Sequence, residues 1–141
     1  MTTQMVSRPR PPAWAQVLGG LAVAALSAGS WWAWMGRDHE YQIDPRTQVA
    51  SGPYEAWQVA GCAGSLLVLL VAALLLRVRW FVASPAMTVA FTAAWTVTAA
   101  STDETGLYGV GLILLLLGLA AAATILSMIV LGLRRLRPTA A

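Results

Sequence analysis

The 141-residue sequence contains no lysine, a single histidine and a single cysteine, and only 11% of its residues are charged. About a quarter of the residues of a soluble domain are charged, so this chain has too few charges to cover a soluble surface. Cys62 cannot form an internal disulfide, and no neighbouring cysteine completes a redox or zinc motif. These shortages argue against a soluble domain held together by disulfides or zinc.

The basic residues of the chain are nine arginines, which occur in short clusters beside apolar runs. A nucleic-acid-binding surface needs a basic patch or stripe on one face of a fold. Arginine clusters that flank apolar runs are instead typical of membrane orientation signals. We therefore expect no nucleic-acid partner.

Apolar residues make up 58% of the chain, and most of them lie in four long segments. About 20 apolar residues in a helix span the hydrocarbon core of a bilayer. We predict an all-α membrane protein, a four-transmembrane-helix bundle with a short extracellular β-hairpin-like loop. The transmembrane helices are expected at 13–35, 53–76, 81–100 and 106–133. Cytoplasmic tails are expected at 1–12 and 134–141, with a cytoplasmic turn at 77–80. An extracellular loop is expected at 36–52 and an extracellular turn at 101–105.

The first apolar segment also has features of a cleaved signal peptide. Arg8 and Arg10 precede it, and Ala25-Leu26-Ser27 could be a cleavage site. The apolar run continues past that point into three tryptophans, and no lipobox cysteine follows. We favour a retained helix, with cleavage as the alternative.

Residues typical of helix ends lie at several of the expected boundaries. Gly52 can cap the second helix, with Pro53 as its first residue. Pro85 marks the first turn of the third helix, as part of a Ser-Pro cap or as a kink. Ser101 and Glu104 have the spacing of a capping box and are expected to begin the fourth helix.

The distribution of charge predicts the orientation in the membrane. The side with both termini and the 77–80 turn carries seven arginines and no acidic residue, whereas the other side carries all six acids and two arginines. Arginine-rich segments remain in the cytoplasm. We therefore expect a multi-pass protein of the plasma membrane with cytoplasmic N- and C-termini.

The tryptophans fall near the expected membrane boundaries, where their amphipathic rings are favoured. We interpret them as interface anchors, with an aromatic ligand cage as the alternative. Those near the inner boundary are Trp14 and Trp80, and those near the outer boundary are Trp31, Trp32, Trp34, Trp57 and Trp95.

Thr88, Thr92 and Thr96 form a stripe on one face of the third helix. Threonine hydroxyls in helices can bond to the carbonyl of the preceding turn, and small residues allow helices to pack closely in lipid. Helix packing is the favoured interpretation of this stripe. The alternative is the polar lining of a small conduit.

The external loop is the longest polar stretch of the chain. Asp44-Pro45-Arg46-Thr47 suits a type I turn, and the flanking alternation predicts a hairpin of 40–43 with 47–50. The group Asp38-His39-Glu40, together with Asp44, suggests a metal or catalytic site at first sight. Neighbouring loop residues rarely converge on one ion, so we assign no catalytic, cofactor-binding or metal-binding residues.

Apart from Glu55 in the first turn of the second span, the expected spans contain no Asp, Glu, Lys, Arg or His. Ion-coupled transport usually needs a titratable group at depth, and a b-type haem needs histidine ligands within the membrane. An ion-coupled transporter and a haem subunit are therefore not expected, and no cofactor is assigned.

The arginine-only basic complement, the Ala/Leu/Val-rich spans and the loop DPRTQVASGPYEAWQV resemble uncharacterised four-span membrane proteins of actinobacteria. The resemblance implies the four-span fold and transfers no functional residue.

These observations favour a non-enzymatic accessory, scaffold or assembly subunit that uses its outer loop for recognition. Its expected partners are the lipid bilayer and other membrane proteins or further copies of itself. The alternative is a small oligomeric conduit or carrier for an uncharged or apolar solute, and a membrane enzyme is third.

Overall fold

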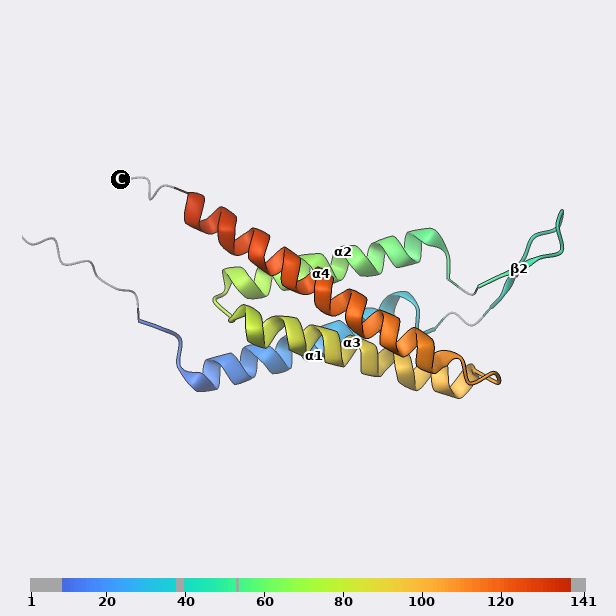
Figure 1. Cartoon of the computed structure of the whole chain (residues 1–141), viewed down its shortest axis with the longest axis horizontal. Coiled ribbons are helices and arrows are strands. Elements are labelled where there is room, and N and C mark those ends of the chain that lie inside the picture. The colour runs from blue at the N-terminus through green and yellow to red at the C-terminus, as the bar shows by residue number, and fades with distance from the viewer. Residues whose placement is uncertain (1–8, 38–39, 53, 138–141) are drawn as a thin grey trace, which may run out of the picture.

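Four long helices lie side by side in the computed structural model, which describes residues 9–37, 40–52 and 54–137 (Figure 1). Each helix is long and apolar enough to cross a membrane. The expected architecture of four apolar helices with a small hairpin is confirmed. The helices are α1 Ala13–Trp34, α2 Ala56–Leu75, α3 Trp80–Thr102 and α4 Tyr108–Leu136.

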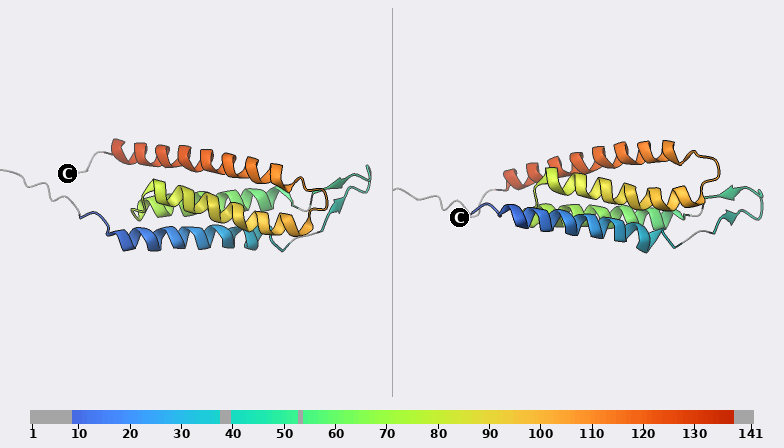
Figure 2. Two further views of the ribbon diagram at one scale, coloured as in Figure 1. Left: turned by 60° about the horizontal axis from the view of Figure 1, so that its bottom comes forward. Right: turned by 90° about the horizontal axis from the view of Figure 1, so that it is seen from below.

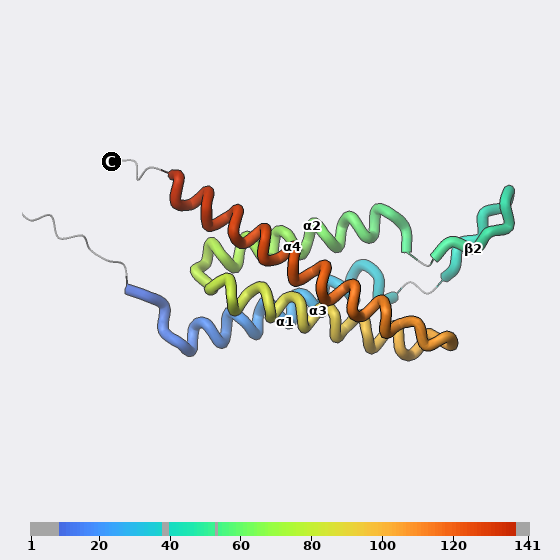
Figure 3. The backbone as a smooth tube through the Cα atoms, in the orientation of Figure 1, coloured from blue at the N-terminus to red at the C-terminus, as the bar shows by residue number. Residues whose placement is uncertain are grey.

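The helices run alternately up and down, so the connections lie at two opposite ends of the bundle (Figure 2). One end, here called the arginine end, contains residues 9–12, 76–79 and 134–137. The other, the hairpin end, contains residues 40–52, 54–55 and 103–108. Figure 3 shows the chain leaving the bundle at the hairpin end to form the projecting hairpin.

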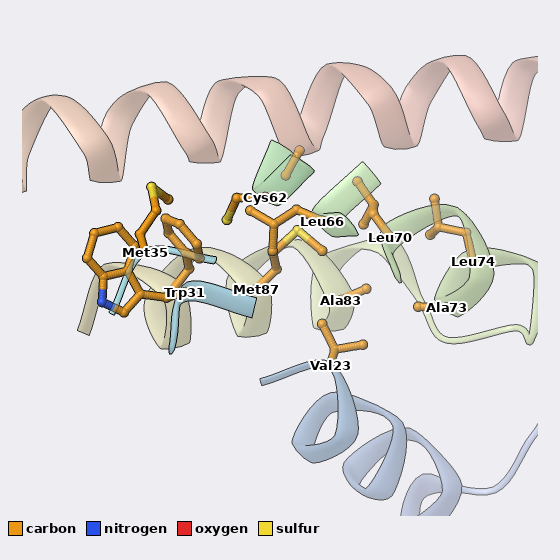
Figure 4. Close-up of a cluster of buried hydrophobic side chains, with 12 residues drawn as sticks. Val23, Trp31, Met35, Cys62, Leu66, Leu70, Ala73, Leu74, Ala83 and Met87 are labelled. Carbon is orange, nitrogen blue, oxygen red and sulfur yellow. The ribbon is translucent and has the colours of Figure 1, made fainter. Parts of the chain in front are cut away.

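The core lies around α2 and α3, which each contact all three other helices, while α1 and α4 lie on opposite sides. Leu66 and Leu70 of α2 and Met87 of α3 belong to one buried apolar cluster (Figure 4). Cys62 is part of this cluster and is only 1% exposed. Many large apolar side chains of all four helices remain on the outer surface, as suits helices that face lipid.

Glu55 is the N-cap of α2, so the prediction that Gly52 caps this helix is wrong. The Glu55 N–H donates to Gln58 Oε1 at 2.8 Å, and the Glu55 carboxylate accepts the backbone N–H of Gln58. This reciprocal pair satisfies two N–H groups that a glycine cap would leave to water. Pro53 lies outside the described residues.

The start of α3 and the α3–α4 connection also differ from the prediction. Pro85 lies inside α3, which begins at Trp80, so Ser84 is not its cap. Ser101 is still helical, and its hydroxyl donates to the Thr98 carbonyl at 2.7 Å, so it does not form the expected capping box with Glu104. Leu107 is the N-cap of α4, and Asp103 accepts the first N–H of this helix, as described below.

The hairpin consists of two antiparallel strands of two residues each, β1 Gln42–Ile43 and β2 Ala50–Ser51. Gln42 pairs with Ser51 and Ile43 with Ala50, so the predicted second strand at 47–50 is displaced toward the C-terminus. The reason is a longer turn: the Gln48 N–H donates to the Asp44 carbonyl at 2.8 Å, and Gln48 has a left-handed backbone.

Two tryptophans expected as interface anchors lie inside the bundle. Trp31 is 2% exposed, and its indole N–H donates to Thr98 Oγ1 at 3.1 Å. The Trp34 indole N–H donates to Ser65 Oγ at 3.0 Å, and its ring lies over Gly61. The small residues Gly61 and Ser65 of α2 thus contact the Trp34 ring of α1. Because Trp31 is buried, the interface-anchor interpretation is wrong for that residue.

The threonine stripe of α3 divides into two kinds of residue. The Thr96 hydroxyl donates to the Thr92 carbonyl at 2.7 Å, as the packing interpretation predicts. The hydroxyl oxygens of Thr88 and Thr92 are buried and have no hydrogen-bond partner in the part of the chain that the structure describes. Unpaired buried hydroxyls are uncommon and destabilising.

Polar contacts to the backbone hold the arginine end together. The Gln16 side chain of α1 donates to the Arg77 carbonyl at 3.0 Å and accepts the Arg79 N–H at 2.9 Å. Arg77 has φ of 68°, and the Val78 N–H returns to the Ala73 carbonyl, which is a Schellman end for α2.

The last turn of α4 is fastened to the same end. Arg134 Nη1 donates to the Leu74 carbonyl of α2 at 2.8 Å. This bond occupies a carbonyl in the last turn of α2, a position that favours a cation. Three of the helices are therefore linked at the arginine end by hydrogen bonds to main-chain atoms.

Candidate functional site

A pocket of about 660 Å³ lies at the hairpin end, where residues near the base of the hairpin meet the α3–α4 connection. About half of its surface is polar, unlike the apolar grooves along the helices. It is here called the hairpin-end pocket. It is lined by Tyr41, Tyr54, Trp95, Ala99, Thr102, Asp103, Glu104, Thr105, Leu107 and Tyr108.

All three tyrosines of the sequence line this pocket, although they come from three separate segments. Tyr41 precedes β1, Tyr54 precedes α2, and Tyr108 is the first residue of α4. The Tyr54 ring meets the buried Trp31 ring edge to face, with centroids 5.5 Å apart. This contact ties one wall of the pocket to the core.

Trp95 forms a further aromatic wall, and α4 determines its position. A Cβ atom added to Gly111 would lie 2.6 Å from the Trp95 ring, so only glycine allows the ring to lie this close to α4. Trp95 therefore packs between α3 and α4, which fixes the spacing of these helices beside the pocket.

Asp103 shapes the rim of the pocket by bonding to the first N–H of α4. One carboxylate oxygen accepts the Thr105 N–H at 2.7 Å and the Thr105 hydroxyl at 2.6 Å, and the other accepts the Tyr108 N–H at 2.7 Å. Bonds from the Thr105 hydroxyl and from backbone N–H groups favour the ionised carboxylate, so they lower the pKa of Asp103. Asp103 is therefore a charged and fixed part of the pocket.

Glu104 is exposed beside it and makes no hydrogen bond or ion pair with any other described residue. Its carboxylate is thus available to a ligand in the pocket. The lining contains two acids and four aromatic rings, and no arginine. Carboxylates and aromatic faces together attract cations, above all guanidinium and ammonium groups.

The loop residues considered for metal binding contribute little to this pocket. Asp38 and His39 lie outside the described residues. Asp44 lies in the hairpin turn, where its carboxylate accepts the Arg46 N–H at 2.8 Å. Within 9–37, 40–52 and 54–137 there is no group of three or more His, Cys, Asp or Glu placed to hold a metal ion.

The hairpin-end pocket was not found by reasoning from the sequence, which considered the loop alone. One signal was present: each tyrosine lies next to the start of an expected structural element at the acidic end. Only the tertiary structure shows that these three positions meet.

Comparison with known proteins gives no relative from which a role could be transferred. No family model matches the chain, and neither the curated proteins nor the solved structures contain a match.

Proposed function

We propose that this chain is a non-enzymatic accessory subunit of the plasma membrane that recognises a basic group of a partner protein through its hairpin-end pocket. Four helices of sufficient length and apolarity support insertion into a bilayer. The arginine end faces the cytoplasm in this proposal, because arginine-rich segments are retained there, and the hairpin end faces outward.

One observation carries the proposal: the hairpin-end pocket combines aromatic faces with two carboxylates and has no basic residue in its lining. Asp103 is held by the α4 N-terminus, so Glu104 supplies the carboxylate that can pair with a ligand. An arginine side chain suits this arrangement, because its flat guanidinium can stack on a tyrosine and bond to a carboxylate at once. The open position of the pocket suits an external segment of another protein.

The test uses the full-length chain in phosphatidylcholine nanodiscs and calorimetric titration with a short arginine-containing peptide. The comparison peptide carries citrulline, which keeps the shape of arginine and lacks its charge. We expect the arginine peptide to bind more tightly. Glu104→Gln should weaken its binding about two- to fivefold, the effect of an exposed ion pair, and Tyr41→Ala should weaken it by a similar factor.

Asp44→Asn is the matched control, because it removes one negative charge at the same end and outside the pocket. We expect it to leave peptide binding unchanged within twofold. Equal binding of the citrulline peptide, or equal weakening by Glu104→Gln and Asp44→Asn, would show that the pocket does not recognise a cation.

A second candidate, a small conduit for an uncharged solute, is supported by the unpaired hydroxyls of Thr88 and Thr92. In a conduit these groups would bond to passing solute. Thr92→Val should then reduce the flux of glycerol into reconstituted vesicles. If the hydroxyls only pack, Thr92→Val removes an unpaired buried group and should raise the free energy of unfolding by about 1 kcal/mol, with no flux in either protein.

A further inference from the structure

A second cavity lies at the opposite end of the bundle, between α2 and α4. Its volume is about 220 Å³, and its walls are the aliphatic side chains of two helices with two arginines beside them. It is here called the arginine groove. It is lined by Val71, Leu75, Val130, Leu133, Arg134 and Arg137.

We propose that the arginine groove binds an anionic phospholipid, with one acyl chain against its aliphatic walls and the phosphate at Arg134 and Arg137. The proposal rests on insertion of the chain into a membrane, as described above. It does not depend on the hairpin-end pocket or on which side of the membrane the arginine end faces.

The aliphatic walls determine where an acyl chain can lie. Val71 and Leu75 are one turn apart on α2, and Val130 and Leu133 face them from α4. These residues lie in the last two turns of α2 and α4. An acyl chain gains little by leaving lipid for this groove, since both surroundings are apolar. Selection among lipids must therefore come from the headgroup.

The two arginines supply that selection. Arg134 uses Nη1 to hold the Leu74 carbonyl, which places its guanidinium over the end of α2 and leaves further N–H groups of the same guanidinium for a phosphate. Arg137 is exposed directly after the end of α4. Two guanidinium groups beside a groove between helices can both bond to the oxygens of a phosphodiester.

The electrostatic surroundings also favour an anion. The C-termini of α2 and α4 both point toward this end, and their partial negative charges oppose a phosphate. Arg134 offsets this at α2 by direct contact with Leu74. The arginine end has no acidic residue in the described part of the chain, and it has six arginines: Arg10, Arg77, Arg79, Arg134, Arg135 and Arg137. The net electrostatic field at this end is therefore positive.

The experiment measures lipid binding to the intact full-length chain by native mass spectrometry from a neutral detergent. Phosphatidylglycerol and phosphatidylcholine with identical acyl chains are titrated in turn. Each arginine near an anionic headgroup contributes roughly fivefold in binding. We expect the first phosphatidylglycerol to bind at least fivefold more tightly than phosphatidylcholine, and Arg137→Gln to remove most of that preference.

Arg135→Gln is the matched control. It removes the same charge only two residues from Arg137, and the Arg135 side chain does not line the groove. It should retain the preference within twofold. Val130→Trp keeps every charge and fills the groove, and it should weaken the binding of both lipids. Circular dichroism of each variant confirms that the helices are intact.

Four results would overturn the proposal. Equal losses in Arg135→Gln and Arg137→Gln would indicate a diffuse positive field, and no preference for phosphatidylglycerol would indicate no anion site. Undiminished binding in Val130→Trp, or displacement of the lipid by soluble glycerol phosphate, would show that the aliphatic walls play no part. Membrane insertion is tested separately by resistance to alkaline extraction, so its failure is distinguished from failure of the groove.

Discussion

The two ends of the bundle are closed by different kinds of interaction. At the arginine end, Gln16 and Arg134 bond to main-chain atoms of the α2 end and the α2–α3 turn. At the hairpin end, Trp31 packs against Tyr54, and Trp95 packs against Gly111. Hydrogen bonds to the backbone draw helix ends directly together, whereas aromatic rings packed between the helices hold them apart at the width of a side chain. The second arrangement leaves room for a pocket that is open to polar ligands.

Trp31→Ala should have the largest effect on the hairpin end. The ring is 2% exposed, contacts Tyr54 and Phe91 edge to face, and donates a hydrogen bond to Thr98. Its removal leaves a cavity, and we expect a loss of about 3–5 kcal/mol in the free energy of unfolding. Titration with sodium dodecyl sulfate in mixed micelles, followed by circular dichroism, measures this quantity.

Trp32→Ala is the control for this prediction, because Trp32 is the next residue and 58% exposed. We expect its effect to stay below about 1 kcal/mol, the range of ordinary surface substitutions. Similar losses for the two variants would contradict the structural role assigned to Trp31 and would restore the interface-anchor interpretation.

Gly111→Ala tests how aromatic packing sets the width of the hairpin-end pocket. The added methyl would lie 2.6 Å from the Trp95 ring, so ring or helix must shift, at a cost of about 1–3 kcal/mol. Gly118→Ala on the same helix meets nothing within 4 Å and should be neutral or stabilise by up to about 1 kcal/mol. Thermal unfolding in detergent distinguishes the two variants, and destabilisation by both would remove the argument from Trp95.

Gln16→Ala breaks the link between α1 and the turn at the arginine end. Two hydrogen bonds are lost, and we expect a decrease of about 1–2 kcal/mol in the free energy of unfolding. Gln16→Glu retains the acceptor for the Arg79 N–H and loses the donor to the Arg77 carbonyl, so its effect should be smaller. A loss in Gln16→Glu as large as in Gln16→Ala would mean that the bond to Arg79 contributes nothing.

The smallest effect concerns Asp103 and appears only in acid. Hydrogen bonds from Thr105 and Tyr108 keep its pKa in the folded protein below the ordinary value of about 3.9. Stabilisation by this carboxylate is therefore complete above about pH 4 and declines as the pH falls through the lowered pKa. Unfolding measured between neutral pH and pH 2 should show this decline, and Asp103→Asn should flatten that part of the curve.

Hydropathy predicted the helices well, because the length and apolar composition that identify a membrane span are local properties of the sequence and do not depend on tertiary contacts. The helix ends were harder to predict. Gly52 and Ser101 are residue types that often cap helices and have suitable spacing, yet Glu55 with Gln58 caps α2, and Asp103 accepts the first N–H of α4 from Tyr108. Several residues near each boundary can cap a helix, and the three-dimensional path of the loop decides among them.

The pocket and the role of Trp31 depend on tertiary contacts that no local pattern contains. A tryptophan near the end of an apolar segment satisfies the same pattern whether its ring faces the headgroups or Phe91. In the same way, Tyr41, Tyr54 and Tyr108 come together only because the hairpin base and the α3–α4 connection lie at one end. Orientation and partner chemistry remain predictions of charge and geometry.

Because Cys62 is buried, the reactivity of its thiol can report how often the helix bundle opens. Its thiol is the only one in the chain and is 1% exposed inside the core cluster. A maleimide reagent can reach it only when α2 separates from its neighbours, so the labelling rate reports how often the bundle opens. The same protection lets a cysteine introduced at the hairpin turn be labelled selectively, and labelling by an impermeant reagent in intact cells would test the predicted external side of the hairpin.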